Sequence, residues 1–372
     1  MPRTALVCTF CLLIAMPVTA APPLPPQPEH TPWPTTSWPT GPLPEDVDGK
    51  LLTRALGGAF QRHIGPAGHP DHRALLVVRK GTVVLESYAP GFGPGSRFFS
   101  WSMAKSITNA LVGILVGEGR LALDAPPPIA PWAEVRDARR AITLRHLMNM
   151  TAGLRDDGNS GKMLFAPAAR RNAYVRAAEV AAETQPGTEW AYSMATSNLL
   201  GGMVSELVGN NRREVSSWAR EALFEPIGAR SFELEFDQTG HFIGGAFSWA
   251  SARDWARLGL LFLRDGNWDG ERILPEAWVD FTRTPAPVAN NTQYGAQFWV
   301  TAESPTQGEK IDPTLQGFYM SGSQGQVVLM VPDRDLIVIR LGEAHHAKWS
   351  EINAMVSQIA RAFPVIEPAS DT

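Results

Sequence analysis

The sequence predicts an α/β fold of the α+β type, in which one antiparallel sheet is built from both ends of the chain. Two apolar runs at 74–78 and 83–85, separated by Lys80-Gly81, are typical of a β-hairpin. Two further strands are expected at 327–331 and 336–341, around a Pro-Asp-Arg-Asp turn. Helical spacing dominates between these ends. We therefore expect a sheet flanked by helices and a mainly helical inserted lobe.

Helix-period patterns account for most of the remaining chain. The segments with this spacing are 51–60, 102–117, 143–150, 170–182, 196–207, 251–263 and 350–363. The segment 102–117 carries apolar residues at steps of four, as a buried stripe requires. Thr143 is placed to cap the short helix that passes through His146. His146 is therefore expected to be structural.

Residues 1–20 are typical of a secretory signal peptide. Arg3 supplies the positive start, 5–16 is an apolar run too short to span a bilayer, and small residues precede a cut after Ala20. Both cysteines of the chain, Cys8 and Cys11, lie inside this segment. We expect export to the periplasm or the medium, without disulfides and without a stable membrane anchor after cleavage.

The division of the chain follows from composition. Residues 22–44 contain ten prolines, so 21–45 is expected to be an extended segment, either a linker or an arm laid on the body. The hydrolase domain is expected over 46–365. Its sheet lobe is assigned to about 46–100 and 245–365, and its helical lobe to about 101–244.

Bulk charge and missing motifs exclude several functions. The net charge is −4 with no basic run, which argues against a nucleic-acid partner and against attachment to an anionic membrane. The sequence has no His-Glu-x-x-His metal motif, no phosphate-binding Gly-Lys-Ser/Thr loop and no Gly-x-Ser-x-Gly elbow. We expect no metal and no cofactor, and the oligomeric state is left open.

Ser102 and Lys105 form the most informative pair. One helical turn separates them, so a hydroxyl and an amine share one face of a helix. A neutral amine in that position takes the hydroxyl proton and creates a nucleophile. By chance, roughly one Ser-x-x-Lys is expected in a chain of this length. Here the pair stands at the start of the strongest helical pattern, where the helix dipole favours developing negative charge.

Two other segments carry candidate chemistry. Tyr192 follows a Pro-Gly turn and precedes a helical pattern, so its phenol is a candidate proton-transfer group beside Lys105. Taken alone, a packed aromatic is the commoner role for such a tyrosine. Residues 320–326, Met-Ser-Gly-Ser-Gln-Gly-Gln, are expected to open a strand, with glycine permitting close approach to a ligand. An ordinary strand-entry loop is the alternative.

Together these motifs resemble the serine β-lactamase/penicillin-binding-protein superfamily. The similarity is nearest to the class C-like branch, which also holds esterases and 6-aminohexanoate-dimer hydrolases. Ser-x-x-Lys is the first motif of that superfamily. Further matching stretches lie at 33–45, 142–154, 224–228, 244–245, 252–257 and 325–326, so the resemblance covers about 33–363. It implies a β-lactamase/transpeptidase-like fold.

The resemblance also implies roles for individual residues. Ser102 would attack a carbonyl carbon, while Lys105 and Tyr192 share the proton transfers. The backbone N–H groups of Ser102 and Ser323 would form the oxyanion hole. Substrate-binding positions would include four residues near these motifs, namely Trp101, Met194, Met320 and Gly322.

Two departures from the superfamily pattern guide the choice of substrate. Penicillin-recognising members carry Tyr-x-Asn and Lys-Thr-Gly, but this chain has Met194 and Met320 at the Asn and Lys positions. A thioether does not pair with a substrate carboxylate. We therefore expect a serine hydrolase of a small ester or linear amide. A β-lactamase or D-amino-acid peptidase is the enzymatic alternative, and a penicillin-acylated sensor the non-enzymatic one.

Overall fold

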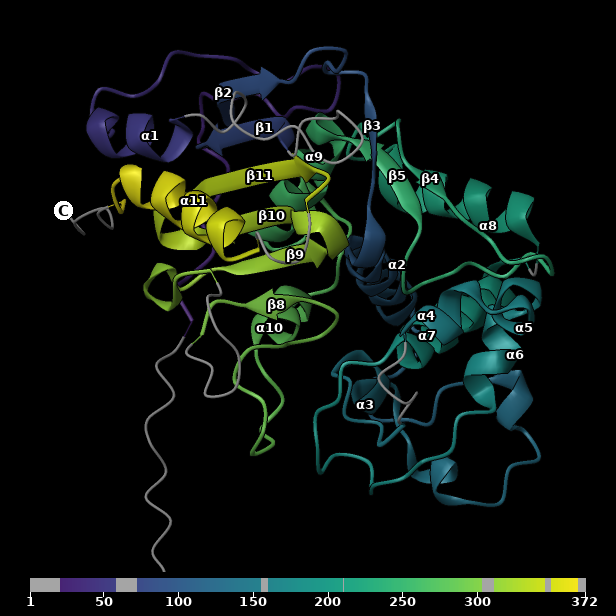
Figure 1. The fold of residues 1–372 in the computed structure, drawn as a ribbon. Coiled ribbons are helices and arrows are strands. Elements are labelled where there is room, and N and C mark those ends of the chain that lie inside the picture. Colours follow the sequence, from purple (N-terminus) through teal and green to yellow (C-terminus); the bar gives the residue numbers. More distant parts are fainter. Residues whose placement is uncertain are drawn as a thin grey trace, which may run out of the picture.

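The computed structural model describes residues 21–57, 72–154, 160–209, 211–302, 311–344 and 349–366. The predicted signal segment, 1–20, lies outside the described residues. Figure 1 shows the main sheet on one side of the molecule and most of the inserted helices on the other, with helix α2 between them. The predicted α+β fold is confirmed. In the described part of the chain, no helix is long and apolar enough to cross a membrane.

The main sheet has six strands in the order β2-β1-β11-β10-β9-β8, and every neighbouring pair is antiparallel. Its strands are β1 (His72–Arg79), β2 (Thr82–Tyr88), β8 (Trp299–Val300), β9 (Phe318–Gly322), β10 (Gln326–Val331) and β11 (Leu336–Gly342). Strand β1 pairs with β11, so Val77 lies opposite Val338. The sheet is therefore built from both ends of the chain, as predicted, and the β1–β11 pair joins the two ends.

Helices cover both faces of this sheet. Successive side chains of a strand point to opposite faces, which explains why the central strands are apolar throughout. Leu75 and Val77 pack with helices α1 (Gly49–Leu56) and α11 (Trp349–Ala362). Leu76 and Val78 belong to the larger core on the other face. That core includes helices α2 (Ala104–Gly117) and α9 (Ala252–Leu263).

The insertion between the two halves of the sheet is mainly helical. Its helices are α3 (Leu144–Met148), α4 (Ser160–Phe165), α5 (Pro167–Arg171), α6 (Ala173–Ala178), α7 (Met194–Val208) and α8 (Arg212–Ala219). A π-helical turn, Arg220–Phe224, continues α8. A small sheet of β3 (Arg97–Phe99), β5 (Ser248–Ser251) and β4 (Glu233–Leu234) joins the insertion to the rest. The remaining strands and α-helix are β6 (Asn267–Trp268), β7 (Glu271–Arg272) and α10 (Trp278–Arg283), and short 3-10 turns occur between the elements.

One predicted helix is divided in the structure. We expected a single helix over 170–182, but α5 ends at Arg171 and α6 begins at Ala173. Asn172 has extended backbone angles, and its side-chain oxygen accepts the Val175 N–H at 2.8 Å. Asparagine competes for backbone hydrogen bonds in this way, so it starts a new helix instead of continuing the old one.

The proline-rich segment 22–44 lies along the body of the protein. Trp38 is 5% exposed, and its indole N–H donates to the Arg253 carbonyl at 3.1 Å. Thr40 forms a parallel bridge with Val83 of strand β2. Of the two alternatives, a linker or an arm laid on the body, these contacts favour the arm, because the segment contributes hydrogen bonds and a buried ring to the fold.

The arm also covers a buried ion pair. Arg264 Nη1 lies 2.7 Å from Asp335 Oδ1, and both side chains are at most 2% exposed. Nη2 donates to Asp335 Oδ2 at 3.0 Å, while Nη1 and Nε reach the arm, at the Pro25 carbonyl (3.2 Å) and at Gln27 Oε1 (2.9 Å). A buried cation needs such partners because its desolvation is costly.

We expect Asp335→Asn to lower the free energy of unfolding by about 3–5 kcal/mol, since it leaves Arg264 buried without a counter-ion. Asparagine keeps the shape and tolerates the left-handed φ of 42° at this position. Urea unfolding followed by tryptophan fluorescence measures the change. Glu134→Gln is the matched control, because its pair with Arg136 is largely exposed and is expected to contribute about 0–1 kcal/mol. Equal stabilities for both variants would contradict this assignment.

Candidate active site

Ser102 lies in a tight turn that leads into the central helix. The turn is a 3-10 element, Trp101–Met103, and α2 then begins at Ala104 instead of at Ser102 as predicted. Twelve of the fourteen residues of α2 are buried, so this helix is fixed by packing on all sides. Ser102 itself is partly exposed. The hydroxyl group is thus held on a rigid element at the surface of the core.

Lys105 connects the Ser102 segment to the Tyr192 segment. Its side chain is buried at 1% exposure, and its Nζ donates to the Gly245 carbonyl at 2.7 Å. The same nitrogen lies 4.9 Å from the centre of the Tyr192 ring and 3.5 Å from the Met194 sulfur. These contacts hold the Lys105 amine inside the protein, between helix α7 and the Gly245 carbonyl.

The Tyr192 segment is held at the start of helix α7. Ser193 caps this helix by accepting the Thr196 N–H at 3.1 Å. The Tyr192 ring stacks on Trp299, with ring centres 5.6 Å apart. It also meets the edge of Tyr294, and burial raises the pKa of the Tyr294 hydroxyl well above its usual value. Tyr192 and Trp299 are partly exposed and Tyr294 is buried, so this aromatic group joins the segment before α7 to strand β8 of the main sheet.

The third segment is a hairpin connection. It opens strand β10 at Gln326, as predicted, and its first residues also end strand β9, which was not predicted. Residues 320–322 end strand β9, and a 3-10 turn at 323–325 leads to β10. The Met320 side chain is fully buried in the core, whereas Ser323 is partly exposed. The Met320 side chain belongs to the larger core, and its predicted contact with substrate stays a prediction.

The hairpin contacts the Ser102 turn directly. Trp101 donates its indole N–H to Gln324 Oε1 at 3.0 Å. A Cβ added at Gly322 would lie 2.2 Å from the Ser100 carbonyl oxygen, so only glycine permits this approach. The structure therefore brings the three predicted segments together. Which of their groups act in catalysis, including the substrate-binding positions, stays a prediction.

We expect Gly322→Ala to lower kcat/KM for a chromogenic ester about 10²-fold, because the turn carrying Ser102 must move. Gly95→Ala is the control, since a Cβ there meets nothing within 4 Å. Both variants are compared by ester hydrolysis and by thermal unfolding. Wild-type activity in Gly322→Ala would show that the close contact does not position Ser102.

Sequence reasoning missed the backbone partner of the amine. Gly245 belongs to a motif that we noted, but its carbonyl was not predicted to bind Lys105. Its own N–H donates to Asn198 Oδ1 at 3.3 Å, which fixes the peptide on helix α7. A backbone carbonyl leaves no residue-type signal in a sequence. The only sequence signal was the Gly244-Gly245 pair. Its lack of Cβ atoms allows this segment to approach helix α7 closely.

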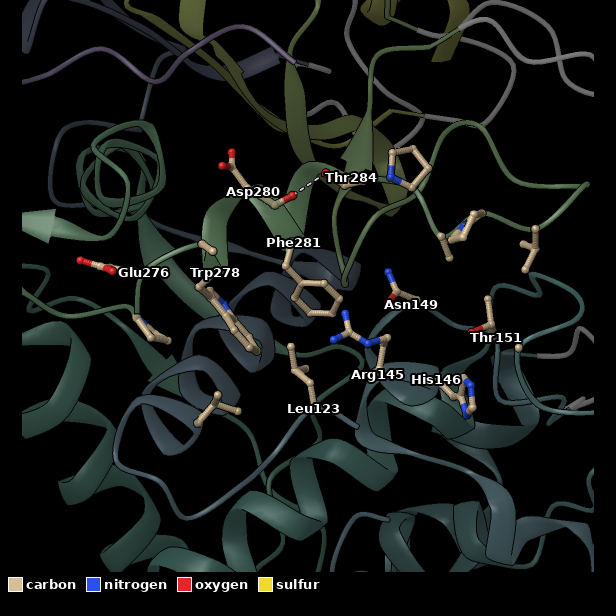
Figure 2. Close-up of a pocket in the computed structure, with 18 residues that line it drawn as sticks. Leu123, Arg145, His146, Asn149, Thr151, Glu276, Trp278, Asp280, Phe281 and Thr284 are labelled. Carbon is tan, nitrogen blue, oxygen red and sulfur yellow. Dashed lines mark hydrogen bonds between the residues drawn. The ribbon is translucent and has the colours of Figure 1, made fainter. Parts of the chain in front are cut away.

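A separate cavity of about 710 Å³ lies between α3 and α10 (Figure 2). Arg145, His146 and Phe281 are among its lining residues, and none of the predicted site residues is. His146 Nδ1 accepts the Thr143 N–H at 3.1 Å, and desolvation by burial lowers the pKa of this imidazole. The structural role predicted for His146 is confirmed by this capping box.

No group of three or more His, Cys, Asp or Glu side chains that could hold a metal ion occurs within the described ranges. The candidate site instead consists of a hydroxyl, a buried amine and a phenol at the junction of three chain segments. Residues 71–352, which contain all three, match the family described as Beta-lactamase. The chain belongs to the Beta-lactamase family. This is a family of serine hydrolases that act on small amide or ester substrates.

Several relatives in this family resemble the chain. A 6-aminohexanoate-dimer hydrolase of Paenarthrobacter ureafaciens is 26% identical over 228 residues, which is 56% of this chain and 56% of that protein. The aligned part thus spans little more than half of that relative. A putative 6-aminohexanoate-dimer hydrolase from Bacillus anthracis superimposes with a TM-score of 0.66 at 20% identity, covering 92% of this chain and 91% of the other.

EstCE1, described as a hydrolase with promiscuous acyltransferase activity, superimposes with a TM-score of 0.63 at 18% identity. The match covers 84% of this chain and 98% of EstCE1. At such identities the structural likeness establishes the β-lactamase fold and leaves the substrate open. The departures at Met194 and Met320 therefore carry the argument about substrate.

Proposed function

We propose that this protein is a serine hydrolase that forms an acyl-enzyme on Ser102 and cleaves a small ester or linear amide. The observation that carries the proposal is the position of Lys105. Its buried Nζ lies over the Tyr192 ring, and Lys105 follows Ser102 by three residues at the turn that leads into helix α2. An amine and a phenol beside a partly exposed hydroxyl are the groups that nucleophilic acyl transfer needs.

The proposed reaction has two halves. Ser102 Oγ bonds to the substrate carbonyl carbon, and its proton passes to Lys105 or Tyr192. The bond to the leaving alcohol or amine then breaks, and that group takes a proton from the same pair. A water molecule next attacks the acyl ester, which releases the acid and restores Ser102. Positioned proton transfer of this kind contributes about 10²–10⁴-fold to a rate.

The backbone N–H groups of Ser102 and Ser323 are the proposed oxyanion donors. Contact between the Ser102 turn and the hairpin at Gly322 supports this assignment, because it holds the two segments side by side. Preorganised donors in such a hole stabilise the tetrahedral intermediate. Losing one donor costs about 3–4 kcal/mol of barrier in comparable hydrolases.

An uncharged substrate fits this site better than a penicillin. Met194 places a sulfur 3.5 Å from Lys105, where penicillin recognisers carry an asparagine, and Met320 is buried. Neither side chain supplies a cation or an amide to a substrate carboxylate. Kinetics with a short-chain chromogenic ester, a linear oligoamide and nitrocefin test the assignment. We expect ester or amide turnover, and nitrocefin hydrolysis of comparable efficiency would favour a β-lactamase.

The mass of the protein after incubation with penicillin distinguishes a non-enzymatic sensor from a hydrolase. A sensor would acquire a stable penicilloyl adduct and turn over no ester, whereas the hydrolase releases product and stays unmodified. Intact-mass measurement after incubation with penicillin separates the two. Export to the periplasm or the medium is part of the proposal, supported by the composition of residues 1–20.

A further inference from the structure

Five aromatic side chains form a continuous group beside the proposed nucleophile. We call it the aromatic shelf, and its members are Phe99, Trp101, Phe165, Phe247 and Trp249. Phe99 is central, with ring centres 4.9 Å from Trp101, 5.5 Å from Phe247 and 4.8 Å from Trp249. All five are at least partly exposed. A contiguous group of exposed aromatic side chains marks a binding site more often than single exposed apolar residues do.

The shelf is built at the cost of backbone strain. Trp101 has a φ of 46° and Phe247 a φ of 67°, and they are the only aromatic residues with left-handed φ among those described. Such angles are outliers for bulky side chains and persist where the surrounding structure imposes them. Both residues adjoin the candidate site: Trp101 precedes Ser102, and Phe247 follows Gly245 by two positions.

The fifth ring comes from the helical insertion. Phe165 ends helix α4, is 55% exposed, and reaches the Phe247 ring with 5.5 Å between centres. It is the only aromatic among the exposed large apolar residues of the described chain. An exposed ring that contacts the opposite lobe forms a rim, which would become buried when an apolar group lies on the shelf.

We propose that the aromatic shelf binds an aryl or long alkyl group of the ester or amide cleaved at Ser102. The inference rests on the proposed function and narrows its substrate class. The shelf begins at Trp101, the residue before the proposed nucleophile, so an apolar group that lies on the shelf is separated by few bonds from the carbonyl that Ser102 attacks. The five side chains of the shelf carry no charge. Two acidic residues adjoin Trp249: Glu235 accepts from its indole N–H at 3.1 Å, and Glu233 is its partner in the small sheet, where it pairs with Arg97.

The test compares kcat/KM for pairs of esters that differ either in the acyl group or in the alcohol group. In the acyl series, p-nitrophenyl 3-phenylpropionate is compared with p-nitrophenyl acetate. In the alcohol series, 2-phenylethyl acetate is compared with ethyl acetate in a pH-stat. We expect the wild-type protein to prefer the phenyl ester in one series. Phe165→Ala should reduce that preference about two- to tenfold, as expected for loss of one aromatic contact.

Two variants complete the design. Phe165→Tyr retains the ring and should retain the preference, whereas Val175→Ala removes an exposed apolar group from the same lobe and should change nothing. An unchanged preference in Phe165→Ala would overturn the shelf proposal alone, because turnover itself persists. If the wild-type protein hydrolysed neither these esters nor a linear oligoamide, the proposed function itself would be wrong. A change of oligomeric state in Phe165→Ala without a change in preference would instead indicate a self-association surface.

Discussion

Ser102→Ala is expected to abolish ester hydrolysis, with a loss in kcat/KM of at least about 10⁴-fold. The reason is that no other hydroxyl has been assigned to attack the carbonyl, and alanine removes the oxygen without disturbing the buried helix that follows. Initial rates with p-nitrophenyl acetate, corrected for the uncatalysed reaction, measure the loss. Thermal unfolding should be close to wild type, because Ser102 is partly exposed.

Ser217→Ala is the matched control for this experiment. Ser217 is exposed on helix α8, and the substitution introduces a strong helix former. It should leave both activity and stability unchanged. If Ser102→Ala retained substantial activity, another residue would have to be the nucleophile.

Lys105→Met is expected to reduce kcat/KM about 10²–10⁴-fold, the range for loss of a positioned proton-transfer group. Methionine keeps an unbranched apolar stem in the buried space but removes the amine. The hydrogen bond to the Gly245 carbonyl is also lost, so unfolding is measured alongside activity. A chromogenic ester assay from about pH 6 to pH 10 follows the effect across the range in which amines titrate.

Lys50→Met provides the control for the change of residue type. Lys50 is exposed in helix α1, far along the chain from the three site segments, and its substitution should not alter hydrolysis. If Lys105→Met folded and kept wild-type activity throughout that pH range, Lys105 would have no part in proton transfer.

Much of the fold was predictable because the sheet is made of short apolar runs at both ends of the chain. The runs at 74–78 and 336–341 pair in the sheet. Each run can be recognised as a strand from its own residues, without information about its partner. The division of 170–182 at Asn172 was missed. Helical spacing continues through this residue, and the competing side-chain cap depends on local backbone geometry.

The site was predictable where chemistry depends on residue type and spacing. Ser102, Lys105 and Tyr192 lie in motifs, and the structure brings their segments together. The Gly245 carbonyl was not predictable as the partner of Lys105, because any residue has a carbonyl. The contact between Phe165 and Phe247 was not predictable either. It depends on how helix α4 packs against the segment before β5, and the local sequence around each residue carries no information about that packing.

The central claim is that Ser102 becomes covalently acylated, and labelling by a p-nitrophenyl alkylphosphonate tests it most directly. Such a probe leaves a stable phosphonyl group on an activated serine and releases p-nitrophenol. Intact-mass measurement and peptide mapping should find one adduct, on Ser102, that blocks ester hydrolysis and is absent from Ser102→Ala. A preparation that hydrolyses esters but carries the adduct on another residue, or carries none, would contradict the assignment.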